Sequence, residues 1–101
     1  MINFDLIVGF DWDSGNRRKS ELKHDVTQSE AEEIFFNAPL LISGDDKHSD
    51  EESRYLALGK TNRARRLTVI FTLRQSATLI RVISARDQHR KERKLYEQAH
   101  E

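Results

Sequence analysis

Apolar residues along the chain form short runs separated by polar and charged segments. Three runs in the second half, residues 54–58, 67–73 and 79–83, predict three strands because they are short, apolar and bounded by polar residues. The segments between them, residues 60–65 and 74–76, are short enough to be turns. Consecutive strands joined by short turns predict an antiparallel meander.

The first half of the chain predicts two strands, residues 4–12 and 40–43, on either side of a helical region. Asp13 or Ser14 can cap a first helix that runs to about His24. This helix is nearly all polar, so we expect it to lie on the surface of a core and not to cross one.

A second helix is predicted from about Gln28 by a capping box of Thr27 and Glu30. Val26 before the cap and Ala31 in the fourth helical position can form a hydrophobic staple. Apolar residues at helical spacing form its buried stripe, which consists of Ala31, Ile34 and Phe35.

A third helix is predicted after the last strand, with Asp87 as its cap. Its stripe would contain Gln88, Glu92, Leu95 and Ala99. The order is then strand, two helices, four strands and helix, which predicts the α+β class and a single domain over residues 1–101. Apolar residues on both parities of the last two strands predict that helices cover much of both sheet faces.

Composition excludes several classes of protein. The chain has no cysteine, so disulfides, thiolate metal sites and cysteine catalysis are excluded. Its first residues lack the basic start of a signal peptide, and their apolar run is too short for a membrane span. We therefore expect a cytoplasmic protein that does not enter a membrane.

The formal net charge of zero hides a division between the two halves of the chain. Residues 1–53 carry 5 Lys or Arg and 13 Asp or Glu, whereas residues 54–101 carry 12 and 4. A basic half of this kind favours a surface for an anionic partner. The alternative is that the two halves form salt bridges with each other on a solvated surface.

Most of the polar residues that can carry chemistry lie in the second half of the chain. Attack of a ribose 2′-hydroxyl on the neighbouring phosphate needs a base, an acid and cations that stabilise the phosphorane. Histidine and glutamate can move protons, and the guanidinium fork of arginine binds two phosphate oxygens. The candidate catalytic residues are His48, Arg54, Arg81, Arg86 and Glu92, and the candidate RNA-binding residues are Arg74, Arg90, Arg93 and Tyr96.

No metal or cofactor is expected, because the sequence has no HExxH motif, Cys/His cluster or glycine-rich phosphate loop. Each candidate also has a structural interpretation. His48 can be a solvated loop residue, Arg81 can pair with Glu92 inside the fold, and Tyr96 can pack against the sheet. The basic run 90–94 can be a solvated helix face.

The chain resembles the BrnT-type toxins, small ribonucleases of type II toxin–antitoxin pairs with a RelE-like fold. The match is densest at residues 81–86, Arg-Val-Ile-Ser-Ala-Arg, followed by Glu92 and Tyr96. One departure is Asp25, which stands where the family usually has glycine and where a left-handed helix end is expected. The other matching segments are residues 10–13, 18–26, 30–35, 45–55, 58–59 and 67–72.

The resemblance implies a metal-independent endoribonuclease that cleaves RNA, with messenger RNA as the expected substrate. It also implies a BrnA-like ribbon-helix-helix antitoxin, whose complex with the toxin binds operator DNA. The residues that match its functional positions are His48, Arg54, Arg74, Arg81, Arg86 and Glu92. Two alternatives remain: a binding module that uses the same basic face without catalysis, and a degenerate toxin that only meets its antitoxin.

Overall fold

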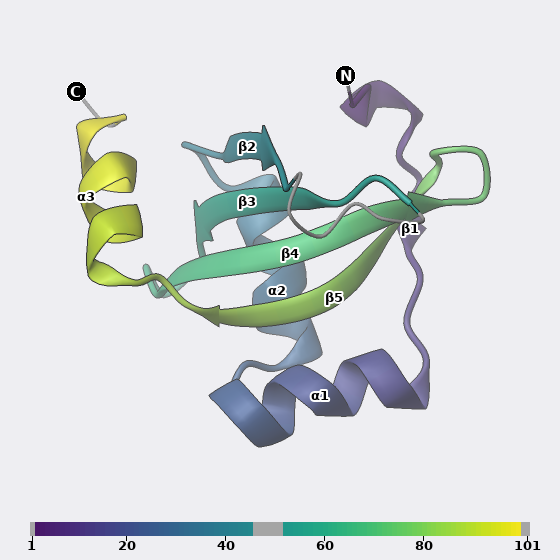
Figure 1. Cartoon of the computed structure of the whole chain (residues 1–101), viewed down its shortest axis with the longest axis horizontal. Coiled ribbons are helices and arrows are strands. Elements are labelled where there is room, and N and C mark those ends of the chain that lie inside the picture. The colour runs from purple at the N-terminus through teal and green to yellow at the C-terminus, as the bar shows by residue number, and fades with distance from the viewer. Residues whose placement is uncertain (1, 46–51, 100–101) are drawn as a thin grey trace.

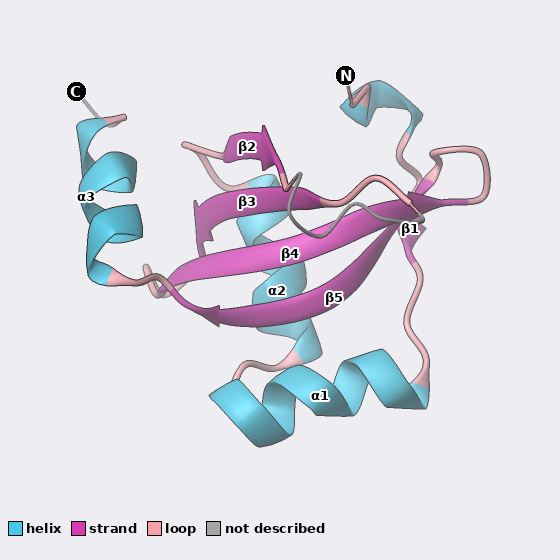
Figure 2. Ribbon diagram, in the orientation of Figure 1, coloured by secondary structure: helices cyan, strands magenta, loops and turns pink. Residues whose placement is uncertain are grey.

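The computed structural model describes residues 2–45 and 52–99. Its centre is a five-stranded sheet in the order β1-β5-β4-β3-β2, with helices on one face, along the β5 edge and at one end of the strands (Figures 1 and 2). The elements are η1 (Phe4–Leu6), β1 (Gly9–Phe10), α1 (Ser14–His24), α2 (Gln28–Glu33), η2 (Ile34–Phe36), β2 (Leu41–Gly44), β3 (Tyr55–Lys60), β4 (Arg66–Arg74), β5 (Leu79–Asp87) and α3 (Arg90–Gln98).

The α+β class and the antiparallel meander are confirmed. β3 pairs with β4 and β4 pairs with β5, each antiparallel, and β2 adds antiparallel to β3. β1 is the one parallel pairing among the described strands, and its partners on β5 are Leu79 and Ile80. The strand predicted over residues 4–12 is shorter than expected, because η1 takes up its start and only Gly9–Phe10 pairs.

Two predicted helix starts are confirmed by their caps. The Asp13 side chain accepts a hydrogen bond from the backbone N–H of Asn16 at 3.0 Å, and the backbone N–H of Asp13 in turn donates to the side-chain oxygen of Asn16. Thr27 and Glu30 form the reciprocal capping box of α2. Asp25 ends α1 in the left-handed conformation (φ 54°, ψ 42°), so aspartate serves here in the place usual for glycine.

One face of the sheet forms the core with α2 and η2, which lie behind the sheet in Figure 1. Alternate residues of the long strands point into it. Gly59 of β3 lies so close to η2 that a Cβ atom there would stand 2.7 Å from Cβ of Ile34. The buried apolar residues of the sheet on this face are Ala57, Leu67, Val69, Phe71, Ile80, Val82 and Ala85.

Helix α1 lies along the edge of β5 and satisfies backbone groups that the short β1 does not reach (Figure 1). The Asn16 side chain donates to the carbonyl oxygen of Val82 at 3.0 Å. The backbone N–H of Ala85 donates to the hydroxyl of Ser20 at 2.8 Å. Both helix residues are buried, whereas the other residues of α1 are exposed, including its one large apolar residue, Leu22.

A β-bulge interrupts the pairing of β4 with β5. Ile70 faces Ser84 and the next residue, Phe71, faces Val82, so Ile83 is the additional residue of β5. A bulge shifts the alternation of side chains by one residue. The burial pattern shows this shift, because Val82 and Ala85 are both buried in the core although three positions separate them.

Three expectations about α3 and the second face are wrong. The cap of α3 is His89 and not Asp87, which still belongs to β5 and binds Arg65. The buried residue of α3 is Tyr96, whereas Leu95 is 59% exposed. Within residues 2–45 and 52–99, helical cover of the second face is restricted to α3 at one end, so the described helices do not cover much of both faces (Figure 2).

Candidate nucleic-acid interface

The sheet face opposite the core carries four of the predicted arginines. Arg54 precedes β3, Arg74 ends β4, and Arg81 and Arg86 belong to β5. Arg81 faces Thr72, and Arg86 faces Thr68, across the same two strands. Without the bulge, Arg81 and Arg86 would point to opposite faces, since five positions separate them. The bulge at Ile83 puts both on the open face.

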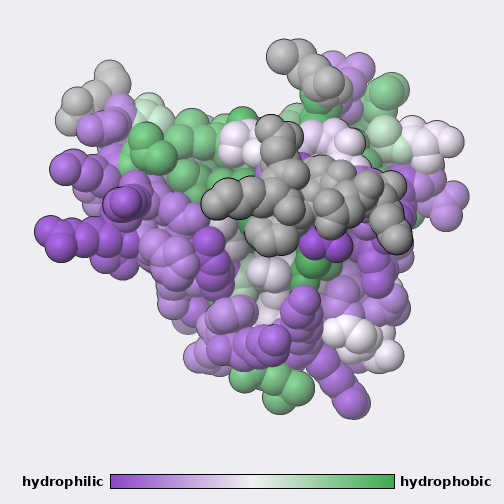
Figure 3. Space-filling view, in the orientation of Figure 1, coloured by the Kyte–Doolittle hydropathy of each residue, from purple (hydrophilic) through white to green (hydrophobic). Residues whose placement is uncertain are grey.

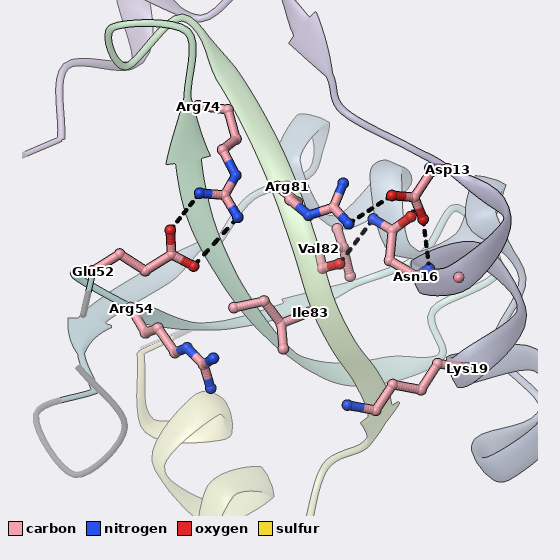
Figure 4. Close-up of a pocket in the computed structure, with 10 residues that line it drawn as sticks. Asp13, Asn16, Lys19, Glu52, Arg54, Arg74, Arg81, Val82 and Ile83 are labelled. Carbon is pink, nitrogen blue, oxygen red and sulfur yellow. Dashed lines mark hydrogen bonds and ion pairs between the residues drawn. The ribbon is translucent and has the colours of Figure 1, made fainter. Parts of the chain in front are cut away.

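Three of these arginines line one hollow of about 420 Å³ between the sheet and the start of α1 (Figure 4). Arg54, Arg74 and Arg81 reach it from three different strands or strand ends, and Lys19 reaches it from α1. Glu52 and Asp13 add carboxylates to its rim. The described lining therefore contains four cationic and two anionic side chains.

Arg81 is held toward the start of α1 by two carboxylates. Its Nη2 atom lies 2.8 Å from Oδ2 of Asp13, and its Nη1 atom lies 3.4 Å from Oδ2 of Asp11. The hydrogen bond with Asp13 is the main reason why the pKa of the Arg81 guanidinium is raised. The predicted alternative of an Arg81–Glu92 pair is wrong, because these aspartates are the partners of Arg81.

Arg74 forms a salt bridge with Glu52, and the pair spans the far side of the hollow from Arg81 (Figure 4). Both side chains remain about one-third exposed (40% and 32%). Surface pairs of this kind contribute little to stability and exchange readily with other ions. A phosphate can therefore replace the carboxylate of Glu52 on Arg74 at small cost.

Arg86 and Glu92 form a second polar cluster where α3 begins. The guanidinium binds the carboxylate through two atoms, with distances of 2.7 and 3.0 Å. Glu92 also accepts hydrogen bonds from the hydroxyl of Thr68 at 2.9 Å and from the backbone N–H of His89 at 2.7 Å. Thr68 is fully buried, so this part of the cluster is anchored in the sheet.

The pKa of Glu92 results from opposing effects. Burial alone would raise it, but the hydrogen bonds from Arg86, His89 and Thr68 together lower the pKa to about 2. Glu92 is therefore ionised at neutral pH and cannot donate a proton in this state. Its geometry suits it to hold the Arg86 fork in a fixed orientation.

The remaining predicted residues have different surroundings. Tyr96 is fully buried and donates its hydroxyl to the carbonyl oxygen of Pro39 at 2.7 Å, so it packs as the structural interpretation predicts and cannot contact RNA directly. Arg90 and Arg93 are exposed on α3, where Arg93 also donates to the carbonyl oxygen of Gln88. His48 lies outside the described residues.

Figure 3 shows hydrophilic side chains gathered over α3 and over the lower part of this view, beside α1 and β5. Apolar surface gathers instead near β2. The acidic half does not stay apart, because Asp13 and Glu52 from that half pair with arginines of the basic half.

Sequence reasoning missed Lys19, Thr68 and Asp13 as members of these clusters. Lys19 follows Asn16 by three positions and so shares its side of α1, but only the structure shows that this side meets β5. Thr68 is one polar position in the most apolar strand, which is a usable signal. Asp13 was recognised as a cap and not as a partner of Arg81.

The described residues contain no group of three or more His, Cys, Asp or Glu placed to hold a metal ion. Within residues 2–45 and 52–99, no helix combines the length and apolar character needed to cross a bilayer.

A comparison with protein families finds a match that covers most of the chain. A family model described as ribonuclease toxin, BrnT, of type II toxin-antitoxin system matches residues 12–92. This segment runs from just before α1 to Glu92 in α3, and it contains both arginine clusters of the open face. No curated protein matches the chain.

Proposed function

Because the chain belongs to the BrnT family of ribonuclease toxins of type II toxin–antitoxin systems, we propose that it is an endoribonuclease that cleaves messenger RNA and so inhibits translation and growth. The observation that supports this most directly is the placement of Arg54, Arg74, Arg81 and Arg86 on one open sheet face. Arginine binds phosphate through two parallel hydrogen bonds, and an open sheet accepts an extended single strand.

In the proposed reaction, the 2′-oxygen of a ribose attacks the adjacent phosphorus and the bond to the 5′-oxygen breaks. The products are a 2′,3′-cyclic phosphate and a 5′-hydroxyl, and the proton lost by the 2′-hydroxyl balances the one gained by the leaving oxygen. Arg86 carries the developing charge of the phosphorane, and Arg81 holds the RNA strand in place by binding another phosphate. No metal takes part in this scheme.

The proton transfers need two groups. Glu92 is ionised, so its part is either to accept the proton of the 2′-hydroxyl or to hold Arg86 in place. Proton donation to the leaving oxygen falls to another group, for which His48 is the candidate from the sequence.

The proposed partner is a BrnA-like ribbon-helix-helix antitoxin. A toxin of this family has an antitoxin partner, and the toxin–antitoxin complex would bind operator DNA through the antitoxin alone. The proposed site of action is the cytoplasm, where messenger RNA is present.

The test is cleavage of a structured RNA by the purified chain in EDTA, beside Arg81→Ala and Arg86→Ala. The wild type should leave 2′,3′-cyclic phosphate ends. Arg86→Ala should lose at least about a hundredfold in rate, as expected for removal of a charge-stabilising donor, and Arg81→Ala should cleave more slowly because it holds the strand less well. Arg63→Ala, which removes an exposed arginine from the β3–β4 turn, should cleave normally.

The melting temperature separates catalysis from folding. Arg81 pairs with partly exposed carboxylates, so Arg81→Ala should unfold within a few degrees of the wild type. A large loss of stability would support a structural role. Intact RNA with a wild type that still binds it would contradict catalysis and leave a binding module.

A further inference from the structure

The hollow beside α1 and the Arg86–Glu92 pair are separate in space. Arg81 and Arg86 face Thr72 and Thr68, which lie four residues apart on β4, so their Cα atoms are roughly 13 Å apart. Their carboxylate partners pull them in opposite directions, Arg81 toward the start of α1 and Arg86 toward α3. Two such groups suit two different phosphates of a strand.

The hollow has the size and charge of an anion site. Its volume of about 420 Å³ lies within the range of about 300–1,000 Å³ of small-ligand sites. Its described cations exceed its carboxylates, and they come from the sheet and from α1. Arg74 and Arg81 supply planar guanidinium groups that can bind two phosphate oxygens. Lys19 supplies a compact charge on a flexible side chain, which can adjust to the position of a phosphate.

Lys19 is placed by the contacts that fix α1. Two neighbours in the helix hold α1 on the backbone of β5: the Asn16 side chain donates a hydrogen bond to it, and the Ser20 hydroxyl accepts one from it. Lys19 lies three positions after Asn16, so it leaves the helix on the same side. Figure 4 shows its amine directed into the hollow beside Ile83, the additional residue of the bulge.

We propose that Lys19 of α1, together with Arg54, Arg74 and Arg81, forms a second phosphate subsite that binds a backbone phosphate of the RNA other than the one held at Arg86. This inference rests on the proposed function for its substrate class. It assigns to α1 a direct part in RNA binding, although α1 contributes no residue to the proposed reaction.

The test measures binding of a single-stranded 2′-O-methyl RNA oligonucleotide, which lacks the attacking hydroxyl, across a series of salt concentrations. Lys19→Ala should weaken binding about three- to tenfold at low salt. It should also reduce the slope of log affinity against log salt by about 0.7, the value for one phosphate contact on a single strand. Lys19→Arg should bind within about twofold of the wild type.

The matched control is Arg17→Ala, which removes one positive charge from the opposite side of α1 and should bind like the wild type. The double variant Lys19→Ala with Arg86→Ala should show the sum of the two slope changes, since separate phosphates act independently. An unchanged slope in Lys19→Ala, an equal loss in Arg17→Ala, or a double variant no weaker than Arg86→Ala alone would overturn the subsite.

Cleavage assays of the same proteins separate this proposal from the proposed function. If the wild type binds but does not cleave RNA, while Lys19→Ala weakens binding, the subsite stands and catalysis fails. If the wild type cleaves and Lys19→Ala binds normally, catalysis stands and the subsite fails. A wild type that cleaves RNA but does not bind the oligonucleotide overturns the subsite alone, and one that does neither overturns both.

Discussion

The two faces of the sheet are formed by the same strands, but apolar packing dominates one face and polar contacts dominate the other. The core face of β4 contains Leu67, Val69 and Phe71, all fully buried, and its partners are aliphatic or aromatic. The open face contains Thr68 and Thr72 between arginines of the neighbouring strands, and each threonine hydroxyl has a specific hydrogen-bond acceptor. Apolar burial on the core face contributes most of the free energy of folding, whereas most of the charged side chains on the open face contribute little to it.

This difference teaches that substitutions on the two faces should have separable effects. Burial of apolar side chains supplies most of the stability of a small fold, whereas partly exposed ion pairs supply little. Core substitutions should therefore lower the free energy of unfolding, and open-face substitutions should change activity first. Three measurements probe that distinction.

The largest effect is expected for Phe71→Ala. Phe71 is fully buried and lies between Phe35 (ring centroids 5.3 Å apart, edge to face) and Tyr55 (5.5 Å, stacked). Its truncation should lower the free energy of unfolding by about 3–5 kcal/mol. Urea denaturation measures this, and Phe71→Leu should lose clearly less. A loss below about 1 kcal/mol would contradict the assignment of this face as the core.

The second effect concerns Glu92, where the open face does contribute to stability. Because its pKa falls from 4.5 to about 2 on folding, its contribution is fully present above pH 4.5 and is lost as the pH falls toward 2. Glu92→Gln keeps a residue suitable for the capping box but removes the charge. The wild type should exceed this variant in stability, and the difference should shrink by roughly 2 kcal/mol between pH 7 and pH 3.

Urea denaturation of both proteins at the two pH values measures the effect. All other carboxylates are common to the two proteins, so their titration cancels in the difference. A difference that stays constant with pH would show that the Arg86–Glu92 contact does not hold the carboxylate in its charged form.

The third effect is expected for Gly59→Ala, which tests how closely η2 packs against the core face and which should be smaller than that of Phe71→Ala. The new Cβ would stand 2.7 Å from Cβ of Ile34, so the backbone or η2 must shift, at a cost of about 1–3 kcal/mol. Gly9→Ala is the control, since its Cβ would meet Leu79 at an ordinary 3.6 Å. RNA cleavage by the folded Gly59→Ala protein should be unchanged. Equal stability of the two variants would contradict the close packing.

Local signals in the sequence predicted the elements well. The cap at Asp13, the capping box at Thr27 and the strand order of the meander depend on neighbouring residues, and the structure confirms them. The third helix was less well predicted, because His89 and Asp87 are both able to cap and only the length of β5 decides between them.

The candidate site was predicted less completely, for a physical reason. Strict alternation separates Arg81 from Arg86, and the bulge that reunites them depends on how β5 pairs with β4. The partners of Arg81 lie about seventy positions away along the chain, where no local pattern reports them. The sequence could name the arginines of the open face but not their arrangement.

The way in which α1 meets β5 has a consequence for the assembly of this protein. An uncovered strand edge is a template on which further chains can polymerise. Here Asn16 and Ser20 occupy backbone groups of β5 that another strand would need. Helix α1 thus blocks the addition of further strands at the β5 edge. A partner strand can then add only at β2, the strand at the other edge of the sheet.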